Sequence, residues 1–445
     1  MLVNDIQHCW NICGYATTDL HDLSDHQKEC VLSDDETKKE ITWSSVAEAL
    51  DVSVKDDKAT KLVLLADMLL AQTEDSMFNI GLHSISSSGK SYIALQVAEL
   101  FPQDDLVILG DASPRAFFHD HDQYDEATHT YIKNLEGKIV ILLDVPSYQL
   151  LKTLRPILSH DKKEIEFKIT DKTKRQQNRT KTIKVVGYAA FIQCSVSSVP
   201  DEQERTRLLL LSAETSQEKL KKSLELMALR ECNREKYEEL VNRDPKRLEL
   251  KRRIQRIRLE KVKDIIIPDE SKVLEKFSEK HPDLKPRHQR DFPRMIDLIK
   301  AHALLNCMNR TRVEEREDVI MANETDVSKG MELYDSVANS NELGLSPYLY
   351  QVYTEVFLPL FDEAEKQEIT HIKRVDLMKK YYSVFHTTLD TRSLNNNITS
   401  QLVQSGLIEE DTDPDDKRKV IYQKPVNLPS KHETKICVYG SGKRF

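Results

Sequence analysis

The chain has 445 residues, of which 39% are hydrophobic and 31% charged, and its formal net charge is −9. This length allows about two to four domains, and the composition is that of a helix-rich globular protein. No apolar run approaches membrane-spanning length and the first residues do not form a signal peptide, so we expect a cytoplasmic protein without a membrane partner. The odd number of cysteines, seven, favours a reducing compartment over a disulfide framework.

Three cysteines and a histidine near the start have the spacing of a C2HC zinc finger. The pattern is Cys9-x3-Cys13-x12-His26-x3-Cys30. Two ligands on a tight turn and two on one helix face would hold Zn²⁺ in a closed, structural site. The alternative is a chance spacing in an N-terminal tail. We predict a zinc finger over residues 1–35, and its acidic helix argues against binding in a DNA major groove.

A phosphate-binding turn is expected at residues 84–91. A helical linker (36–75) precedes it, and from 76 to 213 alternating strands and helices predict an α/β layer with a parallel sheet. The turn reads Ser84-Ile-Ser-Ser-Ser-Gly-Lys-Ser91 and joins an apolar strand to an apolar-periodic helix. Its backbone would cradle the phosphates of ATP, Lys90 would reach the β- and γ-phosphates, and Ser91 would hold Mg²⁺. The predicted nucleotide-binding residues are Ser86, Ser87, Ser88, Gly89, Lys90 and Ser91. Ser84 stands where such loops usually have Gly, and the alternative is a helix capped by serines.

A second apolar strand, residues 138–143, ends in Asp144. A carboxylate at the carboxyl edge of the sheet would hold the Mg²⁺ water shell beside the phosphates. The alternative is a core strand that ends in a turn aspartate. Val145 follows, where most ATPases of this kind have Glu, so the sequence supports ATP binding more strongly than hydrolysis.

A basic hairpin is predicted after this strand. Residues 164–170 and 180–186 alternate apolar and polar side chains, as two paired strands do. The tip has no acidic residue and carries five basic ones: Lys172, Lys174, Arg175, Arg179 and Lys181. Such a tip suits a DNA phosphate backbone, and the alternative is a solvated surface hairpin. A buried strand ending at Ser195 follows, and Arg205 and Arg207 precede the apolar run 208–211.

This order of motifs resembles the AAA+ ATPases over about residues 76–340, in particular the helicase clade with minichromosome-maintenance and superfamily 3 helicases. The resemblance implies that Ser195, or less favourably Gln193, senses the γ-phosphate at a position where the family usually has Asn. It also implies that Arg205 or Arg207 acts on the ATP of a neighbouring subunit in a homo-oligomeric ring, and that the hairpin tracks DNA. Arg294, or less favourably Arg290, matches a lid-helix arginine that contacts phosphates. Residues 313–322 resemble the short helix that follows.

The C-terminal part has three predicted segments before a tail at 431–445. Residues 214–263 are a basic helical insertion, for which we expect a solvated or coiled-coil face in preference to DNA contact. Residues 264–345 are the helical lid. Residues 346–430 resemble a winged helix-turn-helix, in which Arg392 on the recognition helix and Lys417 and Arg418 on the wing would contact DNA. The alternative is a winged helix that docks protein.

Together these features predict an α/β, AAA+ P-loop NTPase core with a helical lid, a small N-terminal zinc finger and a C-terminal winged helix-turn-helix. The expected cofactors are ATP, Mg²⁺ and Zn²⁺, and the expected partner is DNA. The favoured function is an ATP-driven DNA helicase or translocase in replication, for which a mobile element is one setting. The alternatives are a nucleotide-binding, non-hydrolysing regulator or adaptor, and a transcription regulator.

Overall fold

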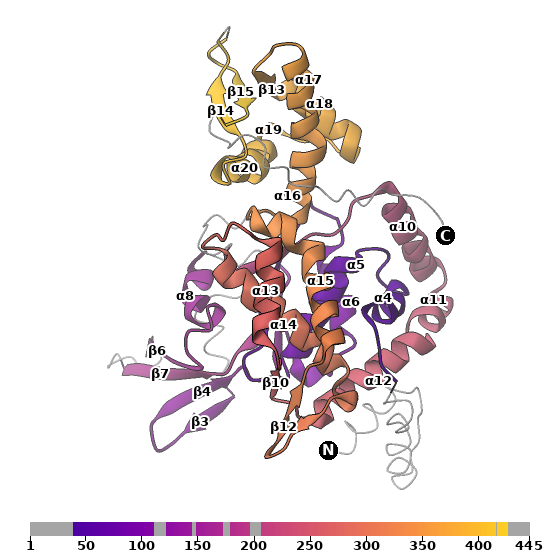
Figure 1. Ribbon diagram of the computed structural model, residues 1–445, viewed down its shortest axis with the longest axis vertical. Helices are drawn as coiled ribbons and strands as arrows, with labels where there is room; N and C mark the ends of the chain where they lie inside the picture. The colour runs from indigo at the N-terminus through magenta and orange to yellow at the C-terminus, as the bar shows by residue number, and fades with distance from the viewer. Residues whose placement is uncertain are drawn as a thin grey trace. The chain divides into compact units, whose positions relative to one another are not determined.

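A computed structural model describes residues 39–110, 122–144, 148–171, 179–195, 206–414 and 416–425 (Figure 1). The chain divides after Tyr350 into two compact units. Outside the described residues lie the predicted zinc ligands, most of the hairpin tip and one arginine: Cys9, Cys13, His26, Cys30, Lys172, Lys174, Arg175 and Arg205. Within the described ranges, every helix is too short or too polar to span a bilayer.

A five-stranded parallel sheet forms the centre of the first unit. Its order is β2-β5-β8-β1-β9, and each neighbouring pair is parallel. The strands are β1 (Asn79–His83), β2 (Leu106–Leu109), β5 (Lys138–Leu142), β8 (Ala189–Ser195) and β9 (Leu208–Leu211). The predicted α/β fold with a parallel central sheet is therefore confirmed.

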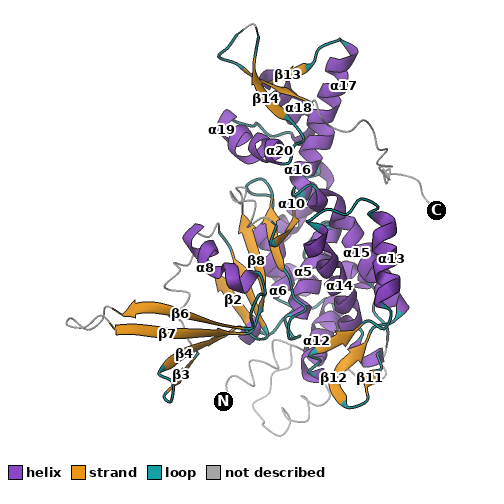
Figure 2. Ribbon diagram, turned by 60° about the vertical axis from the view of Figure 1, so that its left-hand side comes forward, coloured by secondary structure: helices purple, strands orange, loops and turns teal. Residues whose placement is uncertain are grey.

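Helices cover both faces of this sheet because its central strands are apolar on both sides. On β5, Ile139 and Ile141 pack into one core while Val140 and Leu142 pack into another, as a repeat of two residues requires. The first core contains α4 (Trp43–Asp51), α5 (Lys58–Leu70) and α6 (Lys90–Ala98). The second contains α8 (Tyr148–Leu158), which Figure 2 shows on the opposite side of the sheet from α5 and α6.

The lid segment, residues 264–345, is helical but also contains a small sheet. Its helices are α13 (Glu270–Lys280), α14 (His288–Leu305) and α15 (Glu324–Glu342). A Cβ added to Gly330 of α15 would lie 2.4 Å from the Cα of Ile299, so only glycine lets α15 pack this closely on α14.

The small sheet corrects the expectation of a helix over residues 313–322. Its order is β10-β12-β11, with β10 (Asp264–Ile266), β11 (Arg312–Val313) and β12 (Arg316–Met321). Glu315 at the turn has a positive φ of 26° and reverses the chain into β12. Parallel pairing with β10 then holds the segment extended, and this partner lies about fifty residues earlier in the chain.

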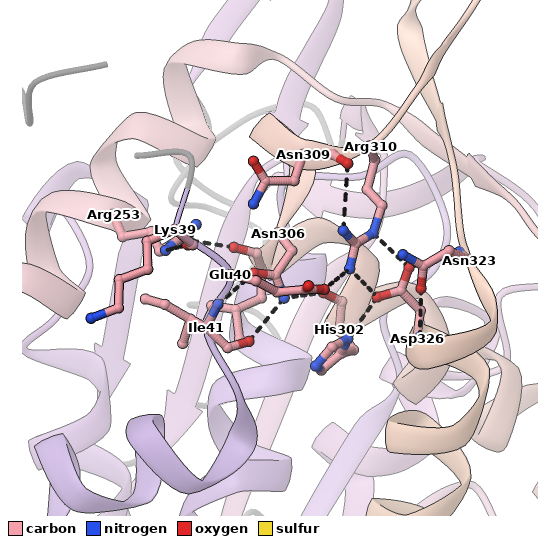
Figure 3. A network of polar contacts seen from close by, with 11 residues as sticks. Lys39, Glu40, Ile41, Arg253, His302, Asn306, Asn309, Arg310, Asn323 and Asp326 are labelled. Carbon is pink, nitrogen blue, oxygen red and sulfur yellow. Dashed lines mark hydrogen bonds and ion pairs between the residues drawn. The ribbon is translucent and has the colours of Figure 1, made fainter. Parts of the chain in front are cut away.

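A buried polar network joins the lid to the residues that precede α4 (Figure 3). Asp326 is fully buried and accepts hydrogen bonds from Arg310 Nε and Nη2, both at 2.7 Å, and pairs with His302 Nδ1 at 2.6 Å. Arg310 Nη2 also reaches Glu40 at 2.7 Å, and Asn306 exchanges two hydrogen bonds with the backbone of Ile41. The network thus fixes residues 40–41 onto α14 and α15.

The basic insertion forms α10 (Gln217–Cys232), α11 (Arg234–Val241) and α12 (Pro245–Glu260). Its predicted helicity is confirmed, but two arginines of α12 do not face solvent. Arg253 is 1% exposed and donates to the carbonyl oxygens of Leu305 and Lys39, and Arg247 is 5% exposed and donates to Ser53 and Glu99. Part of the positive charge of α12 therefore holds the helix onto the core.

The predicted basic hairpin belongs to a second sheet that extends away from the helices (Figure 2). Its order is β3-β4-β7-β6, with β3 (Gln123–Asp125), β4 (Thr130–Asn134), β6 (Glu164–Asp171) and β7 (Arg179–Val186). β6 and β7 are antiparallel, as the alternation predicts. The sequence did not reveal β3 and β4, a second hairpin that pairs with β7 through β4.

The winged-helix prediction rests on an expected order of three helices followed by two strands, and the second unit contains these elements with one more strand, β13, before α18. Its elements after α16 (Pro347–Val352) and the π-helical η3 (Tyr353–Phe357) are α17 (Leu358–Lys366), β13 (His371–Lys373), α18 (Arg374–Phe385), α19 (Thr391–Ser393), η4 (Leu394–Thr399), α20 (Ser400–Gln404), β14 (Glu409–Thr412) and β15 (Val420–Gln423). The strands form one sheet in the order β13-β15-β14. The winged-helix assignment remains a prediction.

Candidate functional site

The turn between β1 and α6 is the candidate phosphate site. All five residues of β1 are buried, so the strand is held within the core and the turn starts from a fixed point after His83. Gly89 caps α6 with φ 92°, a left-handed conformation that glycine adopts without strain. The turn therefore delivers the backbone N–H groups at the start of α6 to the carboxyl edge of the sheet.

Ser84 fits the first position of the turn, where phosphate loops usually have glycine. Its backbone is not among those with positive φ, so the position does not require glycine. Its side chain is 1% exposed and its hydroxyl lies 3.4 Å from the carbonyl oxygen of Ala213. The left-handed positions of this turn are Ser87, with φ 61°, and Gly89. The departure at Ser84 is thus compatible with the shape of the loop.

Lys90 lies inside the turn and is bound by the backbone of the turn itself. Its Nζ donates to the carbonyl oxygens of Ser84, at 3.0 Å, and Ile85, at 2.6 Å, and lies 3.4 Å from Ser88 Oγ. The side chain is 7% exposed, and burial lowers the pKa of its ammonium. A phosphate in the turn would give this ammonium a partner of opposite charge in place of neutral carbonyls.

A thiol lies beneath the turn. Cys194 of β8 is 3% exposed, and its neighbours include the Ser91 hydroxyl and the Lys90 ammonium. Burial raises the pKa of Cys194 to about 11, although Ser91 and Lys90 act in the opposite direction. The thiol is therefore protonated at neutral pH and contributes no charge to the site.

The sheet order brings Asp144 and Ser195 to the same edge as Lys90. Ser195 ends β8 directly opposite His83, the last residue of β1. Asp144 is exposed and follows β5, which pairs with the other side of β8. Two strand spacings of about 4.8 Å each separate β1 from β5, which leaves about 10 Å between their ends. A gap of that size between the strand ends is wide enough for a phosphate group and a hydrated divalent cation.

Two of the predicted arginines, Arg207 and Arg294, lie at the opposite edge of the sheet. Arg207 precedes β9 and its Nε donates to Ser159 Oγ at 2.8 Å. Arg294 is 5% exposed, donates to Asp291 at 2.9 Å and to the Thr206 carbonyl oxygen at 2.8 Å. Burial lowers the pKa of Arg294 to about 10.

The structure does not bring Arg294 to the phosphate turn of its own chain. Leu208 at the start of β9 pairs with Asn79 at the start of β1, so Thr206 lies beyond the amino ends of both strands. The length of β1, five residues at about 3.3 Å each, separates that edge from the turn. Arg207 is excluded from its own turn for the same reason.

The described DNA-contact candidates lie on two separate surfaces. On the projecting sheet, Arg179 opens β7 and the Lys181 Nζ lies 3.9 Å from the centre of the Tyr131 ring. In the second unit, Arg392 is exposed next to its helix cap Asp390, and Lys417 is exposed between β14 and β15. Arg418 is also exposed there and pairs with Asp416 at 3.1 Å.

Comparison with known proteins identifies no family for this chain. No family model matches it, and no curated protein matches it. Among solved structures it is similar to a full-length MCM homolog from Methanopyrus kandleri, at 14% identity and a TM-score of 0.35, over 73% of this chain and 62% of that one. It is also similar to the C-terminal region of NrS-1, at 12% identity and a TM-score of 0.25, over 88% of this chain and 78% of that one. The chain thus covers less than two thirds of the MCM homolog.

Proposed function

We propose that this chain is an ATP-driven motor of the AAA+ helicase type that acts on DNA during replication. The observation that carries the proposal is the placement of Lys90 and Asp144 at one edge of the parallel sheet, with β8 between their strands. A buried lysine whose described oxygen partners are two loop carbonyls and a loop hydroxyl, at the same sheet edge as an exposed carboxylate, suits a phosphate chain and a divalent cation.

Each residue of the turn has a defined part in this proposal. The backbone N–H groups of residues 86–89 would bind the phosphate oxygens, and Lys90 would move from the Ser84 and Ile85 carbonyls to the β- and γ-phosphates. Ser91 and Asp144 would hold Mg²⁺, which when bound neutralises charge on the phosphates. Ser195 would contact the γ-phosphate between them.

The position of the arginines supports a ring of identical subunits. Arg207 and Arg294 lie at the amino edge of the sheet and cannot reach the phosphate turn of their own chain. A neighbouring copy that presents its phosphate turn to this edge would place these side chains beside its nucleotide. Two inactive variants, Lys90→Ala and Arg207→Ala, should then recover part of the turnover when mixed, because some interfaces would combine an intact Lys90 with an intact Arg207.

The DNA contacts are proposed for the β6–β7 hairpin and for the second unit. The hairpin would bind the phosphate backbone through its basic tip, and Arg392, Lys417 and Arg418 would contact a duplex. The four ligands from Cys9 to Cys30 would hold a structural Zn²⁺.

The test is the ATP turnover of the full chain with and without single-stranded DNA. We expect turnover that DNA stimulates, and a loss of about 100-fold or more in Lys90→Ala, because a preorganised group that stabilises transition-state charge is removed. Lys58→Ala, which removes an exposed lysine at the start of α5, is the matched control and should leave turnover unchanged. Turnover that persists in Lys90→Ala would contradict the proposal.

A second candidate is a switch that binds ATP without hydrolysing it. The observation that favours it is Val145, which follows Asp144 where a glutamate would polarise the attacking water. Equilibrium binding of ATP that is lost in Lys90→Ala, together with no turnover in the presence of DNA, would select this candidate over the motor.

A further inference from the structure

Three side chains with metal-binding atoms meet in the lid segment, away from the phosphate turn. They are His281, which follows α13, His288, which opens α14, and Glu342, which ends α15. One ligand atom of each lies within 4.8 Å of the other two. Within the described residues, this is the one group of three or more such side chains that lie so close together.

The distances suit a tetrahedral metal ion. His281 Nδ1 and Glu342 Oε1 are 3.2 Å apart. Ligand bonds of about 2.0–2.1 Å in a tetrahedral zinc site place neighbouring ligand atoms about 3.3 Å apart. The two imidazole rings lie 4.8 Å apart between their centres, at 54° to each other, and the Glu342 side chain is 22% exposed.

His288 has a buried nitrogen that the described residues leave without a partner. Its side chain is 6% exposed, and Nε2 has no hydrogen-bond partner. Buried polar atoms without partners are rare in folded proteins, and an unseen ion is one of their recognised explanations. The other nitrogen, Nδ1, lies 3.3 Å from the Lys285 backbone N–H, a long contact that a metal-bound tautomer with its proton on Nδ1 would give up.

The backbone around the cluster also favours a cation. Glu342 is the last residue of the 19-residue helix α15, where the negative end of the helix dipole opposes a carboxylate. A divalent ion between Glu342 and the two imidazoles would relieve that repulsion. The Phe277 ring, 4.3 Å from the His281 ring and 5.6 Å from the His288 ring, forms an apolar wall against both ligands.

We propose that His281, His288 and Glu342 form a binding site for a divalent transition-metal ion, with zinc the best match to two imidazoles and one carboxylate and with water in the fourth position. The ion would tie together the ends of three lid helices. The site is independent of the proposed function, because none of its ligands touches the phosphate turn.

The test measures zinc in the full chain by elemental analysis after purification and dialysis against a defined zinc concentration. The Cys9→Ser, Cys13→Ser variant removes two of the four predicted N-terminal zinc ligands and serves as the background. We expect about one equivalent of zinc per chain in that background. We expect none after His288→Gln is added, and an unchanged content after His371→Gln, a matched histidine change in the second unit.

Thermal unfolding gives a second readout that separates metal loss from misfolding. Zinc should raise the Tm of the background and of the His371→Gln variant, and should leave the Tm of the His288→Gln variant unchanged. If His288→Gln does not fold, Glu342→Gln, which alters a partly exposed side chain, replaces it and should lower the zinc affinity at least tenfold. A background without zinc, or variants that keep the full zinc content and the full rise in Tm, would overturn the proposal.

Discussion

The phosphate turn and the lid network of Figure 3 both bury charged side chains, but they satisfy them differently. In the network, Asp326 accepts two hydrogen bonds from Arg310 and faces His302, so opposite charges meet within the protein. In the turn, the partners that Lys90 has among the described residues are neutral oxygens, two of them backbone carbonyls. The network is completed by the fold itself, whereas under the proposed function a ligand would complete the turn. The network should therefore contribute stability, and the turn should contribute function.

The largest expected effect on stability comes from Asp326→Ala. Removing this carboxylate leaves Arg310 buried without its opposite charge, which should lower the free energy of unfolding by about 3–5 kcal/mol. Chemical denaturation of the full chain measures the change. Glu332→Ala on the same helix removes an exposed partner of Lys329 and should cost less than about 1 kcal/mol. Equal losses in the two variants would contradict the stabilising role of the network.

As the pH falls, the fold should lose stability through His160 before Asp326 of the network is protonated. Burial lowers the pKa of His160, which stacks on Tyr188, to about 4. Because this pKa is depressed on folding from about 6.5, the stability is complete above pH 6.5 and is lost as the pH falls towards 4, by about 2–3 kcal/mol. Unfolding measured across this range should show the loss, and His160→Asn should flatten it because the asparagine side chain does not titrate. Asparagine also tolerates the positive φ of 53° at this position.

Asp326 should titrate below that range. Burial alone would raise the pKa of Asp326, but hydrogen bonds from His302 and Arg310 outweigh it and lower the pKa. Its contribution is therefore present above the unfolded value of about 3.9 and is lost only as the pH falls further. A loss of stability between pH 6.5 and 4 that survives in His160→Asn but disappears in Asp326→Asn would reverse this assignment.

Alanine substitutions at one glycine of the lid and one of the phosphate turn should lower the stability by different amounts, because the space around the two glycines differs. Gly330→Ala places a methyl group against the backbone of Ile299 and should cost about 1–3 kcal/mol or more. Gly89→Ala meets no atom within 4 Å, and its cost of about 1 kcal/mol comes from the positive φ alone. Thermal unfolding of both variants gives the order, and a larger loss in Gly89→Ala would contradict it.

The smallest expected effect on stability comes from Lys90→Ala. Without a nucleotide, the variant loses hydrogen bonds to Ser84 and Ile85 and should be within about 1 kcal/mol of the unchanged chain. The informative measurement is the rise in Tm on adding ATP and Mg²⁺, which should occur in the unchanged chain and not in the variant. An equal rise in both would place the nucleotide elsewhere.

The sequence predicted those parts of the fold that local patterns specify. The strand, turn and helix around residues 79–98, the buried strand before Asp144 and the β6–β7 hairpin follow from periodicity and turn residues, and the structure contains each of them. The strand β12 was expected as a helix, because its extended form depends on pairing with the distant β10. The short strands β3 and β4 were missed because their pairing depends on β7.

The candidate site was predictable only in part, for a related reason. The Gly-Lys-Ser triplet and the strand ending in Asp144 are local signals, and the sheet order alone brings them together. The position of Arg294 beside Thr206 could not be predicted from a local pattern, because it depends on how α14 packs against the sheet. The His302–Asp326–Arg310 contacts and the His281–His288–Glu342 cluster join residues from separate elements, and no spacing in the sequence marks them.

The anchoring of residues 39–41 has a mechanical consequence. Arg253 and Asn306 bind the backbones of Lys39 and Ile41, and Arg310 binds the Glu40 side chain, which holds this segment against α12 and the lid. A pulling force applied to the chain ahead of Lys39 would load these polar contacts before it loaded the hydrogen bonds between the strands. Tension from that end would thus act on α12 and the lid helices from its first residues onward.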